Sequence, residues 1–177
     1  SKIWEKANKV IVISESIRDW LEKLNSSIKP TVIPYGVEIQ EVSQKNKLAN
    51  PTLGYLGKLN KNKGIEDLID VYTKFQEKEN SSNFELTLLI GGTGSENYIK
   101  SLKNKIKDNN VKFLGYVEDR YSFFESIEIF VFPSYSEGLG LVLLEAMAHG
   151  VICITRDVSP MNSIVDNEEN GFLFKDN

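Results

Sequence analysis

Residues 134–154, SYSEGLGLVLLEAMAHGVICI, decide the fold of this chain. The segment begins with a polar loop that carries Glu137 and continues into an apolar run over 139–148, interrupted by a glycine and by Glu145. A helix that is apolar on almost every side is typically buried. A short apolar strand is expected next, at 151–154. The pattern therefore predicts a loop, a buried helix and a strand, with carboxylates at both ends of a ligand pocket.

Two glycines lie between these carboxylates, at Gly138 and Gly140. Glycine lets a ligand approach the backbone, and a helix beginning near Leu139 would present free N–H groups to an anion. Glu145 would lie about 9 Å along that helix at ~1.5 Å per residue. We therefore expect it and Glu137 to contact different parts of one extended ligand, rather than to form an acid–base pair. The alternatives are a surface charge for Glu137, and for Glu145 a buried carboxylate satisfied by backbone or by an arginine.

The rest of the chain alternates between β-branched runs and amphipathic helical patterns. Strands are expected at 10–14, 31–33, 52–58, 84–90, 111–114, 129–132 and 172–174, and helices from Ser14 or Ser16 to 24, and at 65–78, 95–108, 119–126 and 162–165. This order predicts the α/β class, with a Rossmann-like parallel sheet covered by helices on both faces. The polar stretch after Glu38 suggests a linker. We expect an interdomain segment with a strand–helix–strand unit at 1–50 and a Rossmann-like domain at 51–177.

Four distinctive loops follow strands, at 58–64, 91–95, 115–117 and 133–140. Parallel strands end at a common edge of the sheet, and ligands bind beyond that edge. We therefore expect the loops to converge on one crevice. In the first loop, Lys58 and Lys63 stand beside a helix start at Gly64 and could hold a diphosphate. A solvated surface loop is the alternative.

The second loop, Gly91-Gly92-Thr93-Gly94-Ser95, could let a phosphate or a sugar approach the backbone. Taken alone, it is better explained as a tight connection with Ser95 as helix cap. Tyr116, on the third loop, and Tyr135, on the fourth, are interpreted as packing residues rather than as stacking platforms.

The bulk composition narrows the function classes. The chain has 177 residues, 41% hydrophobic and 26% charged, with a net charge of −4, which is typical of a globular domain and unlike a nucleic-acid-binding protein. Cys153 is the only cysteine, which favours an inert core thiol, and His149 is the only histidine, so no metal site is expected. With no signal peptide and no apolar run of 18 residues, a cytoplasmic location is expected.

Several motifs, in chain order, resemble one family. They are GYLGKLNKNKG (54–64), LLIGGTGS (88–95), VKFLGYV (111–117) and PSYSEGLGLVLLEAMAHG (133–150). Together they resemble the retaining GT-B glycosyltransferases of the large group 1 (family 4) branch. ANKVIVISES (7–16) and VIPYGVE (32–38) are similar to that family's passage into its C-terminal domain. The resemblance implies the C-terminal, donor-binding half of an enzyme that transfers a hexose, with retention, to a glycan or lipid-linked acceptor. The donor would be a UDP- or GDP-hexose, with no metal or other cofactor.

The resemblance also implies roles for single residues. Lys58 and Lys63 would hold the donor diphosphate, and Glu137 would face the donor sugar, so these three are the candidate catalytic residues. Glu145 would accept the ribose hydroxyls. The other donor-binding residues implied are Gly92 and Gly94, Tyr116 and Val117 beside the base, and the backbone of Gly138, Leu139 and Gly140.

Three departures from the family pattern leave alternatives open. Lys58 stands where the family usually has arginine, which keeps the charge but loses the bidentate fork. Ser95 replaces the usual proline, and around Ser163 an expected acid is missing. A GT-B-related nucleotide-sugar epimerase and a non-catalytic sugar-nucleotide-binding module are the alternatives. A nicotinamide-dependent Rossmann protein would need GxGxxG after the first strand, which is absent.

The resemblance places the acceptor-binding N-terminal domain outside this chain. We therefore expect the chain alone to bind a nucleotide without transferring sugar. Contact with a membrane surface is expected only through that other domain.

Overall fold

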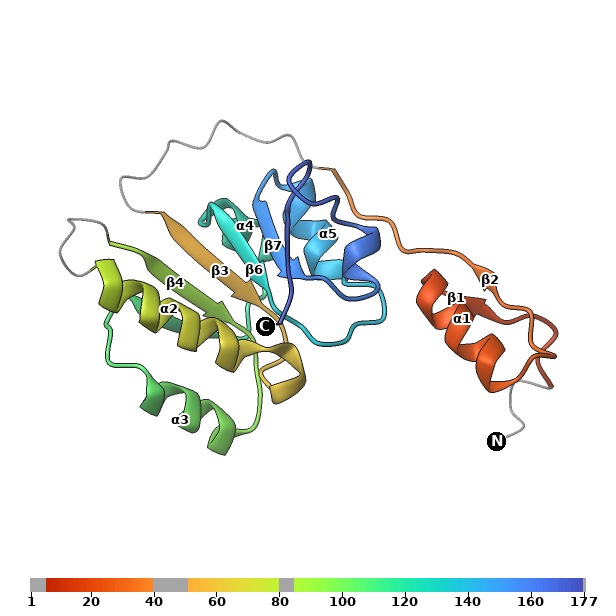
Figure 1. The fold of residues 1–177 in the computed structure, drawn as a ribbon, viewed down its shortest axis with the longest axis horizontal. Helices are drawn as coiled ribbons and strands as arrows, with labels where there is room; N and C mark the ends of the chain where they lie inside the picture. Colours follow the sequence, from red (N-terminus) through yellow and green to blue (C-terminus); the bar gives the residue numbers. More distant parts are fainter. Residues whose placement is uncertain (1–5, 40–50, 80–84, 177) are drawn as a thin grey trace.

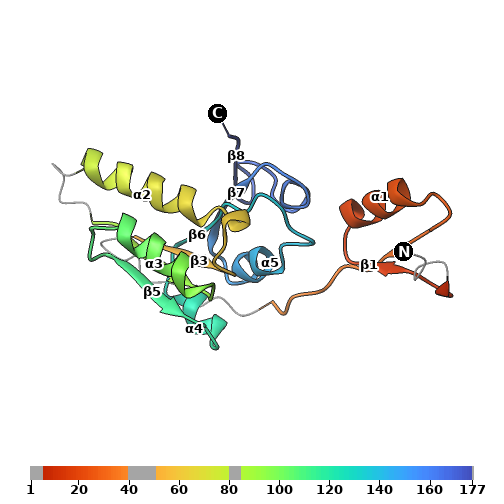
Figure 2. The ribbon, with the colours of Figure 1, turned by 90° about the horizontal axis from the view of Figure 1, so that it is seen from below.

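The computed structural model of the chain describes residues 6–39, 51–79 and 85–176. Within these residues the strands form two parallel sheets, of two and six strands. The smaller sheet lies at one end of the molecule with its helix, on the side of α5 (Leu141–Ala148) rather than of α2 (Ile65–Glu79) (Figures 1 and 2). Most of the expected linker, residues 40–50, lies outside the described residues.

The N-terminal unit consists of β1 (Ile11–Val12), α1 (Glu15–Leu24) and β2 (Thr31–Val32). The helix begins where expected, because the Ser14 side chain accepts a hydrogen bond from the N–H of Ile17. The strands are shorter than predicted because their ladder contains only two residue pairs.

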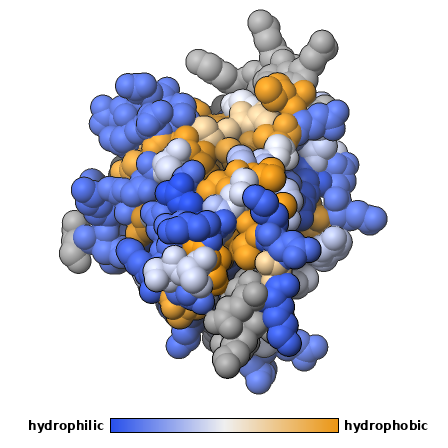
Figure 3. Space-filling model, turned by 90° about the vertical axis from the view of Figure 1, so that its right-hand side faces the viewer, coloured by the Kyte–Doolittle hydropathy of each residue, from blue (hydrophilic) through white to orange (hydrophobic). Residues whose placement is uncertain are grey.

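This unit leaves much of its apolar surface uncovered. The exposed large side chains include Ile11, Trp20, Leu24, Ile33 and Tyr35. Figure 3 faces this end of the molecule and shows apolar surface between the charged groups. The helical spacing therefore predicted α1 correctly, but only Leu21 of its apolar residues is fully buried.

The larger sheet has the strand order β5-β4-β3-β6-β7-β8, and every neighbouring pair is parallel. Its strands are β3 (Thr52–Leu56), β4 (Thr87–Gly91), β5 (Val111–Gly115), β6 (Ile129–Phe132), β7 (Ile152–Arg156) and β8 (Phe172–Phe174). Besides α2 and α5, its helices are α3 (Glu96–Lys105), α4 (Arg120–Glu125) and two short 3₁₀ turns, η2 (Lys61–Lys63) and η3 (Met161–Ser163). The predicted Rossmann-like α/β class is confirmed.

Two separate cores hold helices to the two faces of this sheet. On one face, α2 packs through Ile65, Leu68 and Ile69 against β3 and β4. On the other, α4 and α5 contribute Phe124 and Leu143 to a core with β6 and β7. Figure 2 shows α2 on the opposite side of the sheet from α4. This is the three-layer arrangement that alternating strands and helices predict.

The helix at the centre of residues 134–154 differs from the prediction in its burial. Only Leu143 and Ala146 of α5 are fully buried, and the other six residues are half-buried. The helix begins at Leu141, two residues later than expected, because Gly140 has left-handed backbone angles and acts as its N-cap. An apolar composition on every side therefore overestimated how deeply this helix lies.

No helix in the described part of the chain is long and apolar enough to cross a lipid bilayer.

The order in which strands are added to the sheet reverses between β3 and β6. These strands are neighbours in the sheet although α2, α3, α4, β4 and β5 separate them in sequence. In open α/β sheets, the loops at the carboxyl ends of strands on either side of such a point diverge and leave a crevice. The topology therefore places a candidate site between the loops that follow β3, β4, β5 and β6.

Candidate functional site

The loops after β3, β4 and β5 are tied to one another through their backbones. The N–H of Leu59 donates to the carbonyl of Thr93 at 2.7 Å, and the N–H of Gly92 donates to the carbonyl of Gly115 at 2.7 Å. At Gly92, φ is 138° and a Cβ atom would overlap the carbonyl oxygen of Gly57. Only glycine allows this close approach.

The loop after β6 joins the same assembly. The N–H of Tyr135 donates to the carbonyl of Asn62 at 3.0 Å. At Gly64, where φ is 65°, a Cβ atom would overlap the carbonyl of Pro133. The predicted convergence of the four loops is therefore present in the structure.

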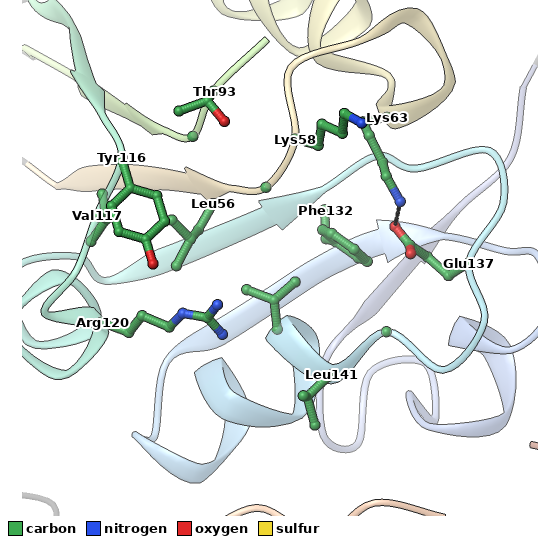
Figure 4. Close-up of a pocket in the computed structure, with 14 residues that line it drawn as sticks. Leu56, Lys58, Lys63, Thr93, Tyr116, Val117, Arg120, Phe132, Glu137 and Leu141 are labelled. Atoms are coloured by element: carbon green, nitrogen blue, oxygen red, sulfur yellow. Dashed lines mark hydrogen bonds and ion pairs between the residues drawn. The ribbon is translucent and has the colours of Figure 1, made fainter. Parts of the chain in front are cut away.

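These loops enclose an open cavity of about 740 Å³. Its walls are formed by Leu56, Gly57, Lys58, Lys63, Gly92, Thr93, Tyr116, Val117, Arg120, Phe132, Glu137, Gly140, Leu141 and Val142. Figure 4 shows Tyr116 and Arg120 on one side of this space, and Lys63 and Glu137 on the other. A cavity of this size falls in the range of small-molecule sites.

Lys63 and Glu137 form the best-defined polar contact in the cavity. The Lys63 Nζ atom lies 2.6 Å from Oε1 of Glu137, and the two side chains are only 21% and 13% exposed. Figure 4 shows the pair on one wall of the cavity, with Lys58 beside it. The expected proximity of these residues is confirmed, whereas their roles toward a ligand stay predictions.

Glu145 is paired with an arginine, as one of the two interpretations from sequence allowed. Nη1 of Arg120 lies 2.9 Å from each carboxylate oxygen of Glu145. The glutamate does not line the main cavity. It borders a neighbouring pocket of about 270 Å³, and Arg120 lines both spaces.

The charged groups on the described cavity wall are predominantly cationic. Lys58, Lys63 and Arg120 face Glu137 as the single carboxylate. Among the described residues no carboxylate pairs with Lys58, which is exposed to solvent. The cavity therefore favours an anion, although the whole chain has a net charge of −4.

Seven of the predicted site residues line the cavity, whereas the others lie around it. Lys58, Lys63, Gly92, Tyr116, Val117, Glu137 and Gly140 line the cavity. Gly94 borders an adjoining pocket of about 510 Å³ together with Lys58. Gly138 and Leu139 lie in the loop behind the wall, and Leu139 is buried. The carbonyl of Gly138 accepts a 2.7 Å hydrogen bond from the Ser14 hydroxyl, which links the loop to the N-terminal unit.

Two tyrosines expected to pack behave differently from each other. Tyr116 is 74% exposed at the cavity, so the expectation of a packing role is wrong for this residue. Tyr135 does pack, because the Arg156 guanidinium lies 3.9 Å from its ring centroid. The Tyr135 hydroxyl also donates to Asp67 at 2.8 Å.

Arg156 supports the loop after β6 from behind. Its side chain is 3% exposed, its Nη2 lies 2.7 Å from Oδ2 of Asp67, and its Nε donates to the carbonyl of Pro133 at 3.1 Å. Sequence reasoning missed this residue. The signal was an arginine at the end of the apolar strand 151–155, since a charged group at such a position needs a partner.

Tyr55 holds the first loop in a similar way. Its hydroxyl donates to the carbonyl of Lys58 at 3.1 Å. Burial raises the pKa of Tyr55 well above its ordinary value, and the charge of Glu137 raises it further. The phenol therefore stays protonated and keeps its donor at neutral pH.

No group of three or more histidine, cysteine, aspartate or glutamate side chains that could hold a metal ion is found in the described part of the chain.

Residues 37–177 match the protein family described as glycosyl transferases group 1. A capsular polysaccharide biosynthesis glycosyltransferase of Staphylococcus aureus, CapM, is 32% identical over 94% of this chain and 48% of its own length. A phosphatidyl-myo-inositol mannosyltransferase of Mycobacterium leprae is 30% identical over 92% of this chain and 44% of its own length. The chain thus spans about half the length of these relatives.

Solved structures share the fold at lower identity. Anabaena HepE, in complex with UDP and glucose, superposes with a TM-score of 0.81 at 21% identity, over 97% of this chain and 50% of its own. The pneumococcal O-GlcNAc transferase GtfA, in complex with UDP and GlcNAc, gives 0.81 at 24% identity, over 98% and 35%. These likenesses support the Rossmann-like, GT-B type of architecture.

Proposed function

Because the chain belongs to the glycosyl transferases group 1, to which residues 37–177 match, we propose that it is the donor-binding half of a sugar-transferring enzyme. The nucleotide-sugar would bind in the cavity at the carboxyl ends of β3 to β6. The observation that carries this proposal is the cationic wall formed by Lys58, Lys63 and Arg120 around a single carboxylate.

The donor diphosphate is assigned to Lys58 and Lys63. Lys58 has no carboxylate partner in the described residues, and Lys63 has three donors of which Glu137 uses one. When the glycosidic bond breaks, the nucleoside diphosphate gains negative charge. Two cations on the cavity wall, together with the start of α5, stabilise that charge, so that transfer requires no metal ion in this domain.

The donor sugar is assigned to the space beside Glu137, whose carboxylate is held by Lys63. A fixed carboxylate on this wall either stabilises a developing oxocarbenium ion or attacks the anomeric carbon. The backbone at Gly140, and the neighbouring Gly138 and Leu139, would contribute N–H groups to the phosphates or the sugar hydroxyls.

The nucleoside is assigned to the other end of the cavity. Tyr116 and Val117 line that end, and their backbone would contact the base. Glu145 would accept the ribose hydroxyls from the neighbouring pocket, which shares Arg120 and Leu141 with the cavity. Gly92 and Gly94 lie in the loop after β4 and leave space for the phosphates.

The complete enzyme is proposed to transfer a hexose with retention to a glycan or lipid-linked acceptor. The donor would be a UDP- or GDP-hexose. The names of two relatives support polysaccharide or glycolipid biosynthesis as its setting, because they describe a capsular polysaccharide glycosyltransferase and a mannosyltransferase. A cytoplasmic location, with membrane contact through the acceptor domain, fits such acceptors.

Titration calorimetry of the full chain with UDP, GDP and NAD tests the donor site. We expect heat from UDP or GDP and none from NAD, because the cavity offers a diphosphate clamp without the dinucleotide fingerprint. Binding of NAD without either nucleoside diphosphate would overturn the proposal. Adding a nucleotide-sugar and analysing the products tests the expectation that this chain binds but does not transfer; a released or epimerised sugar would contradict it.

A further inference from the structure

Arg120 occupies an electrostatically unfavourable position. It is the first residue of α4, directly after Asp119, whose side chain caps the helix by accepting a 3.0 Å hydrogen bond from the N–H of Ser122. The helix dipole disfavours a cation at a helix N-terminus. A compensating interaction is therefore expected for this side chain.

Glu145 provides that interaction. Nη1 of Arg120 lies 2.9 Å from Oε1 and 2.9 Å from Oε2, so that one N–H group is shared between both oxygens. The contact joins the start of α4 to the middle of α5, in the neighbouring pocket that Arg120 shares with the cavity. Figure 4 shows the guanidinium directed into the cavity from the side of Tyr116.

Both partners keep groups that can form further hydrogen bonds. Each carboxylate oxygen has two lone pairs, so Glu145 retains acceptor positions after binding Nη1. In the described residues, Nε and Nη2 of Arg120 have no hydrogen-bond partner. Glu145 can therefore accept two further O–H groups while its charge remains compensated.

Charge compensation matters in a site for a diphosphate. An uncompensated carboxylate near the ribose would repel the phosphates, and the repulsion is strengthened by the low dielectric of a partly enclosed cavity. The Glu145 side chain is only 22% exposed, so solvent screens it poorly. A neighbouring arginine removes this repulsion and fixes the orientation of the carboxylate.

We propose that Arg120 is a positioning residue for nucleotide recognition, which holds the Glu145 carboxylate oriented and charge-compensated so that it accepts the vicinal hydroxyls of the donor ribose. This inference rests on the proposed function, since it assumes that a nucleoside diphosphate occupies the cavity.

The test compares the affinities of the full chain for UDP and for 2′-deoxy-UDP by calorimetry, or for GDP and 2′-deoxy-GDP if GDP is the ligand. We expect the wild-type chain to prefer the ribose form by about 10-fold, which corresponds to 1.4 kcal/mol. Glu145→Ala should reduce this ratio to near one. Arg120→Ala should reduce it to below about three-fold, and the double variant should have the same ratio as Glu145→Ala.

Further variants separate positioning from a merely structural role. Arg120→Lys keeps a cation that can reach Glu145, so it should restore part of the ratio even if Arg120→Ala folds poorly. Lys105→Ala removes the 3.1 Å ion pair with Glu66 between α3 and α2, away from the cavity, and should leave the ratio unchanged. Loss of affinity for both nucleotides by the same factor in both Arg120 variants would overturn the inference.

The outcomes distinguish this inference from the proposed function. If the wild-type chain binds neither nucleoside diphosphate, the proposed function fails. If it binds both forms equally, the assignment of Glu145 to the ribose hydroxyls fails, and the role of Arg120 with it, while the donor site stands. If it prefers ribose and Arg120→Ala keeps the full preference, only the role of Arg120 is refuted.

Discussion

The ammonium nitrogen of Lys63 lies 2.6 Å from Oε1 of Glu137, across 74 positions of sequence. The two residues come from loops that follow β3 and β6, the neighbouring strands at which the sheet order reverses. Their contact ties the proposed diphosphate clamp directly to the carboxylate assigned to the sugar. A nucleotide-sugar whose diphosphate binds Lys63 therefore also changes the electrostatic environment of Glu137.

Replacing Lys63 should weaken nucleotide binding. Lys63→Ala removes one of the two proposed diphosphate cations and leaves the half-buried Glu137 carboxylate facing the ligand. We expect the Kd for the nucleoside diphosphate to rise by about 10- to 100-fold, or 1.4–2.8 kcal/mol. Calorimetry measures this change.

Lys61→Ala is the matched control for that substitution. Lys61 belongs to the same 3₁₀ turn but borders the adjoining pocket rather than the main cavity. It should change the Kd by less than about 3-fold at 0.15 M salt, where an exposed charge is screened. Equal losses in the two variants would refute a specific role for Lys63.

Gly92→Ala should destabilise the fold. The new Cβ would overlap the Gly57 carbonyl, and φ at this position is 138°, which disfavours any side chain. We expect a loss of at least about 3 kcal/mol in the free energy of unfolding. Urea denaturation followed by circular dichroism measures it.

Substitutions at two other glycines measure backbone strain separately from steric overlap. Gly115→Ala places a Cβ in open space at φ +71°, so it should cost only about 1–2 kcal/mol, from backbone strain. Gly36→Ala meets no atom within 4 Å and should stay within about 0.5 kcal/mol of the wild type. A Gly92→Ala chain as stable as the Gly36→Ala chain would show that the loops after β3 and β4 are not in contact.

Arg156→Ala should also lower stability, by about 2–4 kcal/mol, because it removes a buried group that bonds Asp67 and the Pro133 carbonyl. Arg156→Lys should recover less than half of this loss, since an ammonium cannot reproduce the fork or the stacking on Tyr135. The control is Lys175→Ala. It removes an ion pair with Asp157 in which the lysine side chain is 81% exposed. Equal denaturant midpoints for Arg156→Ala, Arg156→Lys and Lys175→Ala would contradict this prediction.

Cys153 should be unreactive in the folded chain. The thiol is buried in the core beneath α5, and burial raises its pKa to about 12. We expect a thiol reagent such as Ellman's reagent to react at pH 8 only at the rate of unfolding, and at once in 6 M urea. Fast labelling of the native chain would place Cys153 outside the core.

Stability should fall in acid through Asp108, which joins α2 to the segment before β5. Partial burial raises the pKa of Asp108, but the N–H of Asn110 and the side chains of Gln76 and Tyr72 lower it further, to a net value below the ordinary 3.8. A lowered pKa adds stability above pH 3.8, and this contribution is lost as the pH falls through the folded-state value. The difference in unfolding free energy between wild type and Asp108→Asn should therefore shrink from pH 6 to pH 3. A constant difference would show that the Asp108 charge does not matter.

The sequence predicted the elements of this site better than their contacts. Strand ends could be located from apolar runs, and the rule that parallel strands end at one edge brought Lys58, Lys63 and Glu137 together. The sequence did not predict a role for Arg120, because the partner of this residue depends on the order of the strands in the sheet. Only once β5 and β6 are known to lie on opposite sides of β3 does the start of α4 face the middle of α5.

Burial was the other quantity that periodicity could not supply. The spacing of Ile17, Trp20, Leu21 and Leu24 defines an apolar face of α1, yet Trp20 and Leu24 are 58% and 62% exposed. An apolar face shows which side of a helix can be buried, whereas its actual burial depends on what packs there. The same limit applies to α5, in which only Leu143 and Ala146 are fully buried.

The hydrogen bond from Ser14 to the Gly138 carbonyl has a mechanical consequence. The accepting carbonyl belongs to Gly138, the residue after Glu137, and the donor is the N-cap of α1 in the unit of the smaller sheet. Any hinge rotation that swings the small sheet away must stretch or break this bond, and a rotation that keeps it must carry the peptide along. Movement of the smaller sheet is thereby coupled to the loop that carries the glutamate.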